Sequence, residues 1–126
     1  MTGRKHETEM KEAEKLALNA RIREVADTIL STHAIERMQQ KSVTVREIEN
    51  CLKYGNGIEI HNEQGELRAV VRHAYGRPKV AVCVVIGLES STIVTTWKNS
   101  GSDNHKTLNT LAYGWNVNVV ELLARA

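Results

Sequence analysis

The residues of this sequence best suited to chemistry are a histidine and an arginine, His33 and Arg37, in the segment "STHAIERMQQ". In a helix their spacing places both side chains on one face, a single turn apart. Histidine transfers protons near neutral pH, and the planar guanidinium of arginine binds two oxygens of a phosphate at once. The pair therefore suits proton transfer beside a negatively charged group. The alternative is that His33 caps or packs a helix and Arg37 forms an ordinary surface ion pair.

A long amphipathic helix is predicted for residues 5–30, which are rich in strong helix formers. Residues 6–15 are mostly polar, so we expect the beginning of this helix to be solvated. Its apolar residues recur at helical spacing, and they are Leu18, Ile22, Val25 and Ile29.

Two shorter helices are predicted to follow. The first spans about residues 31–40, with its Ser-Thr pair as the cap. For the second, Thr44 and Glu47 have the spacing of a capping box, in which each side chain satisfies a backbone donor of the other residue. Gly55 is a natural end for this helix. The face expected to be buried consists of Val45, Ile48, Cys51 and Leu52.

Four strands are predicted after Gly57, where the apolar period changes from that of a helix to that of a strand. They lie in "GIEIHNE", "ELRAVVRH", "KVAVCVVIG" and "STIVTTWK". The turn sequences "NEQG" and "YGRP" join them as hairpins. The third segment is apolar on both faces, which is typical of a central strand. Alternation predicts which residues share a face of each strand. In the first strand Ile58 lies with Ile60, and Glu59 lies with His61. In the second strand Leu67, Ala69 and Val71 share one face and Arg68 and Arg72 the other, and in the fourth strand Ile93, Thr95 and Trp97 share a face.

Helices segregated from hairpin-linked strands indicate an α+β fold. We expect N-terminal helices, a four-stranded antiparallel meander sheet covered on one face, and one or two C-terminal helices within residues 105–126. The chain would form a single domain in three parts. These are an N-terminal helix extension (1–30), an α+β core (31–98) and a C-terminal helical tail (99–126) packed on the core.

Composition and charge exclude several classes of protein. The 126 residues carry a net charge of +2, which is too small to indicate a nucleic-acid partner unless the positive charge gathers on one face. No apolar run approaches the roughly 18 residues of a membrane helix, and no signal peptide opens the chain. We therefore expect a cytoplasmic protein without a membrane partner.

No metal or cofactor site is predicted. Cys51 and Cys83 form no CxxC pair and lie in apolar runs, so we expect two reduced, unlinked thiols. Together with Cys51, the histidines His61 and His73 do not have the spacing of metal ligands. Phosphate-binding loops, dinucleotide turns and nucleophile elbows are also absent from the sequence.

Four segments resemble an uncharacterised bacterial and phage domain family: "THAIERMQQKSVTVREIENCL", "GIEIHNEQGELRAVV", "KVAVCVVI" and "IVTTWK". The family pattern has a Ser/Thr-x-His-Ala-x-x-Arg-Met helix, an Ile-Ser/Thr-x-x-(Glu/Asp)-Ile helix, a Gly-Glu-x-Arg hairpin and a closing Thr-x-Trp strand. In layout the family is similar to the RelE/BrnT-type toxins and to the barnase-like ribonucleases. The resemblance covers about residues 31–98. It departs from the family at Lys41, where the pattern often has arginine.

The resemblance implies a RelE-like fold and a toxin-like domain that binds or cleaves RNA as a metal-independent ribonuclease, without a cofactor. Such an enzyme needs a proton acceptor, a proton donor and cations at the phosphate. The residues expected to be catalytic are His33, Arg37 and Arg68. Those expected to bind RNA are Arg72, Thr95, Trp97 and Lys98, with Trp97 stacking on a base. His73 and Tyr75, near a hairpin tip, could assist.

A second interpretation is a catalytically inactive protein-binding module of the same fold, such as a phage-encoded modulator of a host protein. The protein partner would then be antitoxin-like or a host protein, and a homodimer through the N- or C-terminal helices is also possible. In this interpretation Arg68 and Arg72 are charges that prevent edge association, and Trp97 is a core or interface anchor.

Overall fold

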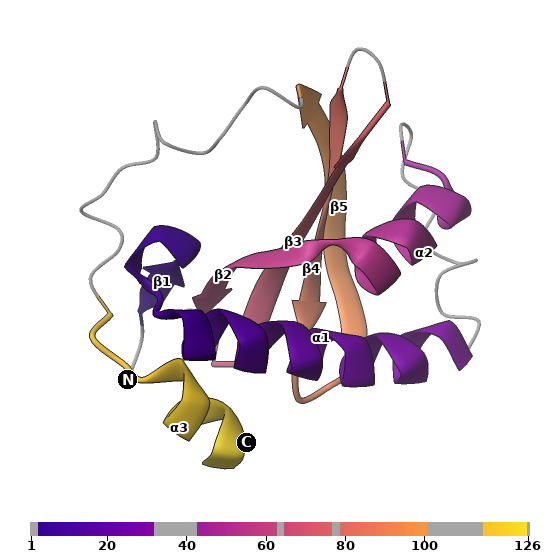
Figure 1. Ribbon diagram of the computed structural model, residues 1–126. Helices are drawn as coiled ribbons and strands as arrows, with labels where there is room; N and C mark the ends of the chain where they lie inside the picture. Colours follow the sequence, from indigo (N-terminus) through magenta and orange to yellow (C-terminus); the bar gives the residue numbers. More distant parts are fainter. Residues whose placement is uncertain (1–2, 32–42, 63–64, 77–78, 101–114, 126) are drawn as a thin grey trace.

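The computed structural model describes residues 3–31, 43–62, 65–76, 79–100 and 115–125. In chain order the elements are β1 (Arg4–His6), the 3₁₀ helix η1 (Glu7–Glu9), α1 (Glu12–Ser31), α2 (Val45–Tyr54), β2 (Asn56–His61), β3 (Arg68–Tyr75), β4 (Val80–Gly87), β5 (Thr92–Ser100) and α3 (Val119–Arg125). The strands form one antiparallel sheet in the order β1-β2-β3-β4-β5. Helices α1 and α2 lie across one face of it (Figure 1). The predicted α+β fold is confirmed.

The sheet has five strands rather than the four predicted. The additional strand, β1, pairs with β2 and places Lys5 opposite Ile60 and His6 opposite Glu59. The prediction of helix for residues 5–30 is therefore wrong over β1 and η1. Helix propensity is a weak local preference, and it is overridden here because pairing with the edge of β2 satisfies backbone donors and buries Lys5 and His6.

Helix α2 begins and ends where the sequence indicates. The backbone N–H of Glu47 donates to Thr44 Oγ1 at 3.1 Å, and the N–H of Thr44 donates to Glu47 Oε1 at 2.9 Å, which completes the capping box. Gly55 is the C-cap. The helix predicted over about residues 31–40 lies almost wholly outside the described residues. The expected apolar face of α2 packs in the core, with Ile48, Cys51 and Leu52 buried and Val45 partly buried.

Two β-bulges alter the faces expected from strict alternation. In β2 the register shifts beside Gly57, so Ile58 does not share a face with Ile60. In β5 a second shift turns Ile93 toward the helices, whereas Trp97 lies on the opposite side. A bulge inserts one extra residue, and because strand side chains have a period of 2, one residue reverses every face assignment beyond it.

The core lies between the helices and the face of the sheet that they cover, which we call the helix face. It includes Leu67, Ala69 and Val71 of the β3 region, as predicted. Strand β4 is buried on both sides of the sheet, because Val85 packs in a second cluster on the other side. The opposite side of the sheet is the back face. By register its residues include Arg4, His6, Ile58, Glu59, His61, Arg68, Val70, Arg72, Cys83, Val85, Thr95 and Trp97.

The C-terminal helix α3 packs beside α1 (Figure 1), with Val119 and Leu123 buried. Cys51 and Cys83 are both buried and neither forms a disulfide, so the predicted unlinked thiols are confirmed. Within the described part of the chain, no helix is long and apolar enough to cross a membrane.

Candidate functional site

Four of the predicted site residues share the back face of the sheet. Arg68 and Arg72 lie four positions apart on β3, with Val70 between them on the same face, and Thr95 and Trp97 lie on β5 beyond the intervening strand β4. Arg68, Arg72 and Trp97 are half-buried, and Thr95 is exposed. The alternation of arginine with valine in "RAVVRH" thus places two cations on the face that the sequence indicates.

The other predicted site residues do not join this group in the described structure. Lys98 lies on the helix face, because it pairs with Val82 across the β4–β5 ladder. His33 and Arg37 lie outside the described residues. Their convergence with Arg68 therefore stays a prediction.

A histidine lies between two arginines on the back face. The register places His61 opposite Arg4 on one side and opposite Arg68 on the other. Directly opposed side chains on antiparallel strands have Cβ atoms about 4.5–5.5 Å apart. Two guanidinium groups and an imidazole from three adjacent strands therefore lie side by side. We call these three residues the Arg4–His61–Arg68 row.

The neighbouring cross-strand pair is also titratable. His6 lies opposite Glu59, two positions along the same strands. The Glu59 Oε1 atom lies 3.7 Å from Arg4 Nη1, and it is buried without a hydrogen bond among the described contacts. The His6 Nδ1 atom accepts the backbone N–H of Thr8 at 3.3 Å. This contact leaves the proton of neutral His6 on Nε2.

The acid–base groups of the back face are more deeply buried than its cations. His6, Glu59 and His61 are only 6–7% exposed, whereas the side chains of Arg4 and Arg68 are 36% and 22% exposed. The arginines can therefore reach an anion in solvent, whereas the imidazoles and the carboxylate are largely shielded from solvent. In such a partly desolvated place, electrostatic interactions are stronger than in water.

Lys98 has a structural contact that its sequence position did not reveal. Its Nζ lies 2.9 Å from Glu47 Oε2, and the hydroxyl of Tyr75 also donates to Glu47. Burial opposes ionisation of Glu47, but the hydrogen bonds from Tyr75, Lys98 and Thr44 lower its pKa to about 2. The same carboxylate raises the pKa of Tyr75 to about 12. This network joins α2 to β3 and β5.

A groove of about 260 Å³ opens where β2 begins, and we call it the β2 groove. It combines a cation, an imidazole and an aromatic ring. The residues lining it are Glu7, Tyr54, Asn56, Ile58, Arg72, His73 and Ala74. Arg72 belongs both to this groove and to the back face, so the two are continuous.

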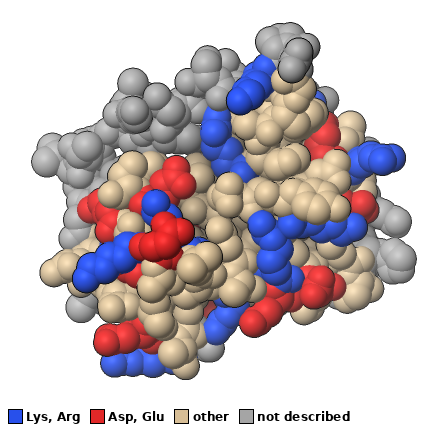
Figure 2. All heavy atoms as spheres, viewed as in Figure 1, with Lys and Arg blue, Asp and Glu red and all other residues tan. Residues whose placement is uncertain are grey.

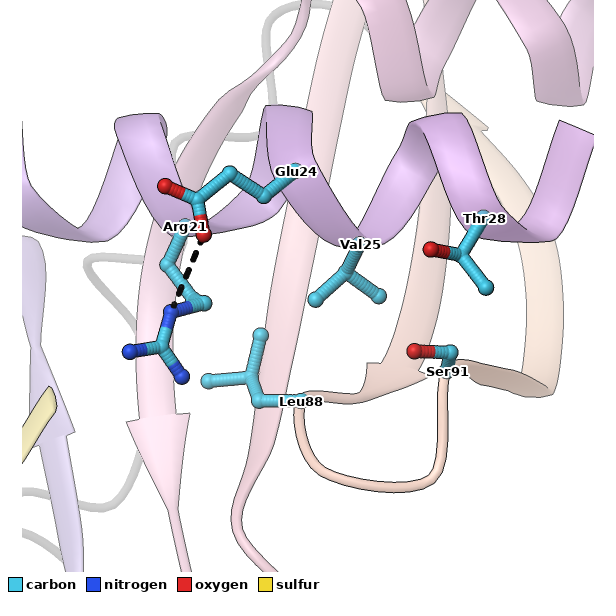
Figure 3. Close-up of a pocket in the computed structure, with 6 residues that line it drawn as sticks. All are labelled: Arg21, Glu24, Val25, Thr28, Leu88 and Ser91. Carbon is cyan, nitrogen blue, oxygen red and sulfur yellow. Dashed lines mark ion pairs between the residues drawn. The ribbon is translucent and has the colours of Figure 1, made fainter. Parts of the chain in front are cut away.

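A second hollow, of about 360 Å³, lies between α1 and the β4–β5 turn, and Figure 3 shows the six residues that line it. Arg21 Nε lies 3.7 Å from Glu24 Oε2, and Arg21 Nη2 donates to the carbonyl of Leu123 at 2.6 Å. Both charged side chains of this hollow are thus paired. It contains no histidine, so it is less suited to acid–base chemistry than the back face.

Charges of both signs are interspersed over the side of the molecule that carries the helices (Figure 2). Blue and red side chains lie next to one another there, without a continuous basic patch among the described residues. The arginines of the Arg4–His61–Arg68 row are instead concentrated on the back face. Each of these arginines lies at ion-pair distance from a carboxylate, Arg4 from Glu59 at 3.7 Å and Arg68 from Glu66 at 3.8 Å.

Sequence reasoning missed the role of β1 in this site. It placed Glu59 and His61 on one face of a strand, and the register confirms that they share the back face. His6 was assigned to a helix and Arg4 to no element, and no local signal indicated a strand there. Among the described residues, no group of three or more His, Cys, Asp or Glu side chains could hold a metal ion.

A family model described as a domain of unknown function, DUF4258, matches residues 30–98. The match includes α2 and the strands β2 to β5 as far as Lys98, whereas β1 and α3 lie outside it. Neither the curated proteins nor the solved structures gave a match. Since the model covers more than half of the sequence, the chain belongs to the DUF4258 family.

Proposed function

We propose that this DUF4258 protein is a toxin-like RNA-binding domain of bacterial or phage origin, and that it cleaves RNA by metal-independent acid–base catalysis on the back face. The observation that best supports this is the position of His61 between Arg4 and Arg68. A RelE-like fold is part of the same proposal, because it follows from the resemblance to the RelE/BrnT-type toxins, and a cytoplasmic location is proposed with it.

The back face contains the three kinds of group that this reaction needs. Arginines bind the non-bridging oxygens of a phosphodiester and stabilise the charge that develops there. Imidazoles accept and donate protons near neutral pH. A carboxylate beside an imidazole favours its protonated form. The arginines are Arg4 and Arg68, and the imidazoles are those of His61 and His6. The carboxylate is that of Glu59.

The proposed reaction begins when His61 accepts the proton of a ribose 2′-hydroxyl. The 2′ oxygen attacks the adjacent phosphorus, a bond forms between them, and the bond from phosphorus to the 5′ oxygen breaks. His6 donates its Nε2 proton to that leaving oxygen after Nδ1 has released the Thr8 contact and taken up a proton, and Glu59, opposite His6, balances the positive charge of the imidazolium. Arg4 and Arg68 hold the phosphate throughout. The products are a 2′,3′-cyclic phosphate and a free 5′-hydroxyl.

The test is cleavage of a labelled single-stranded RNA in the presence of a metal chelator, with mass analysis of the ends. Loss of a general acid or base typically lowers the rate about 10²–10⁴-fold, which is the expected effect of His61→Gln. Arg68→Ala should also slow cleavage, whereas Arg46→Ala should not. Arg46 is a matched control because it is exposed on α2, on the other side of the sheet.

The predicted pair His33 and Arg37 is tested in the same assay with His33→Ala and Arg37→Ala. If both lower the rate while thermal stability is unchanged, they act in the reaction together with the back face. Absence of any cleavage by the wild-type protein contradicts the enzyme proposal. So does cleavage that survives both His61→Gln and His33→Ala.

A second candidate function is a catalytically inactive module that binds an antitoxin-like or host protein. Two large apolar side chains favour it, since Leu16 on α1 is 63% exposed and Val120 on α3 is 40% exposed. The two helices pack together, so both residues could contribute to a partner or homodimer contact at the ends of the chain. Expression in bacteria separates the candidates: a ribonuclease toxin arrests growth, and a binding module is tolerated.

A further inference from the structure

We infer that the β2 groove is a subsite for one nucleobase of single-stranded RNA, with the adjoining phosphate bound by Arg72. This inference rests on the proposed function, because it assigns the substrate of the same face more closely. The groove adjoins the back face through Arg72 and Ile58, and both residues line it. An RNA strand that crosses the back face can therefore place a base in the groove.

Aromatic rings at the groove form a short series. The His73 ring stacks on Tyr75 with a centroid distance of 5.7 Å and an interplanar angle of 22°, and Tyr54 lies 6.4 Å from His73 at 45°. Tyr54 and Tyr75 are 67% and 39% exposed. Exposed aromatic rings beside a cation are a common means of binding bases of single strands, because every base has a stacking face.

The local topology explains why this site is open. The pairing of β2 with β3 ends where Asn56 lies opposite Arg72. Beyond that point His73 and Tyr75 of β3 pair only with β4 in the described register. Helix α2 ends at Tyr54, directly before β2, so its last residue contributes to the groove at the place where the sheet loses a neighbouring strand.

The polar groups of the groove suit the edge of a base and the phosphate next to it. Asn56 is exposed and carries both a donor and an acceptor, and Glu7 carries only acceptors when ionised. A carboxylate repels a phosphate but accepts from ring N–H and amino groups, so we place the base edge near Glu7. The guanidinium of Arg72 suits the phosphate.

The size of the groove also favours a single base. Sites that enclose a drug-sized ligand have volumes of about 300–1,000 Å³, and this groove has about 260 Å³. It therefore suits a flat ring system, with the ribose and phosphate outside it. The rest of the strand would lie along the back face.

The experiment measures binding without cleavage. A fluorescent single-stranded RNA with 2′-O-methyl riboses cannot react, because the attacking hydroxyl is blocked, and its affinity is measured by anisotropy. Stacking on one aromatic residue is worth about 1–3 kcal/mol per base by alanine substitution, so Tyr54→Ala should weaken binding by about 5- to 150-fold. Tyr54→Phe keeps the ring and should bind like the wild-type protein.

Thr28→Ala is the control, because Thr28 is uncharged, exposed on α1 and outside the groove. It should bind like the wild-type protein. A second probe has abasic sites in place of bases. For that probe the wild-type protein and Tyr54→Ala should differ by less than about twofold, because no base is present to stack. A purely structural role of Tyr54 would weaken both probes equally.

The outcomes separate this inference from the proposed function. One outcome is that the wild-type protein cleaves RNA, and that Tyr54→Ala and the wild-type protein bind the methylated RNA equally tightly. In that case the groove is not a base subsite and the catalytic proposal stands. If Tyr54→Ala weakens base-containing RNA alone and the wild-type protein does not cleave, the subsite stands and the catalytic proposal is wrong. A wild-type protein that binds neither RNA nor the abasic probe overturns both.

Discussion

Lys5 of β1 donates a hydrogen bond to Glu14 of α1 at 2.8 Å, and both side chains are buried. Lys5 Nζ also donates to the carbonyl of Val117 at 2.7 Å, and Glu14 Oε2 accepts the backbone N–H of Val119 at 2.9 Å. This ion pair therefore ties the first strand and the long helix to the C-terminal helix, which lies more than a hundred positions later in the sequence.

Removing the cation of this pair should destabilise the protein strongly. Lys5→Met leaves the Glu14 carboxylate buried without its partner, and breaking a buried ion pair from one side typically costs about 3–5 kcal/mol. Urea unfolding measures the change. Lys53→Met, an exposed position on α2, is the control and should change the free energy of unfolding by less than about 0.5 kcal/mol. Equal stability of Lys5→Met and Lys53→Met would show that the pair does not hold the ends of the chain.

The stability of the protein should fall in acid because of Glu47. Its pKa is lowered from the ordinary value of 4.5 to about 2, so its ionised form stabilises the folded state. That contribution is complete above about pH 4.5 and is lost as the pH falls toward about 2. Denaturation of the wild-type protein and Glu47→Gln at several pH values from 2 to 6 measures the effect. The variant should depend less on pH in this window, and an unchanged pH dependence contradicts the network.

Lys98 and Arg72 should contribute differently to RNA binding. Lys98 pairs with Glu47 on the helix face, so we expect Lys98→Met to lower stability and to change RNA affinity by less than about twofold. Arg72 is proposed to bind a phosphate, so Arg72→Met should weaken binding and reduce the salt dependence by about one phosphate contact. Anisotropy titrations at several salt concentrations compare the two. The assignment fails if Lys98→Met alone reduces the salt dependence.

Cys51 should be chemically inert in the folded protein. Its side chain is fully buried, its Sγ donates to the carbonyl of Val71 at 3.4 Å, and burial raises its pKa to about 12. Because the thiolate is the reactive form, iodoacetamide at pH 8 should leave Cys51 unmodified until the chain is denatured. Mass analysis of peptides gives the result, and rapid modification of Cys51 under native conditions contradicts the described packing.

The sequence alone determined the features that depend on neighbouring residues. The capping box of Thr44 and Glu47 and the cap at Gly55 fix helix α2 through contacts made within one turn of the chain. The alternation that separates Arg68 and Arg72 from Leu67 also needs only the two-residue period of a strand. These features are readable because each is decided by residues that are adjacent in sequence.

Only the tertiary structure decided the remaining features. Residues 4–6 are a strand because the edge of β2 is available to pair with them, and their own composition favours a helix. The bulge beside Gly57 moves Ile58 to the back face, because one inserted residue reverses the alternation.

The candidate site itself follows from long-range pairing. His6 lies opposite Glu59, and Arg4 lies opposite His61, although more than fifty positions separate the members of each pair. Sequence spacing carries no information about which strand edges will meet, since strand pairing is set by the core that both strands must cover. The sequence therefore determined which residues could perform the chemistry, and the order of the strands decided which of them came together.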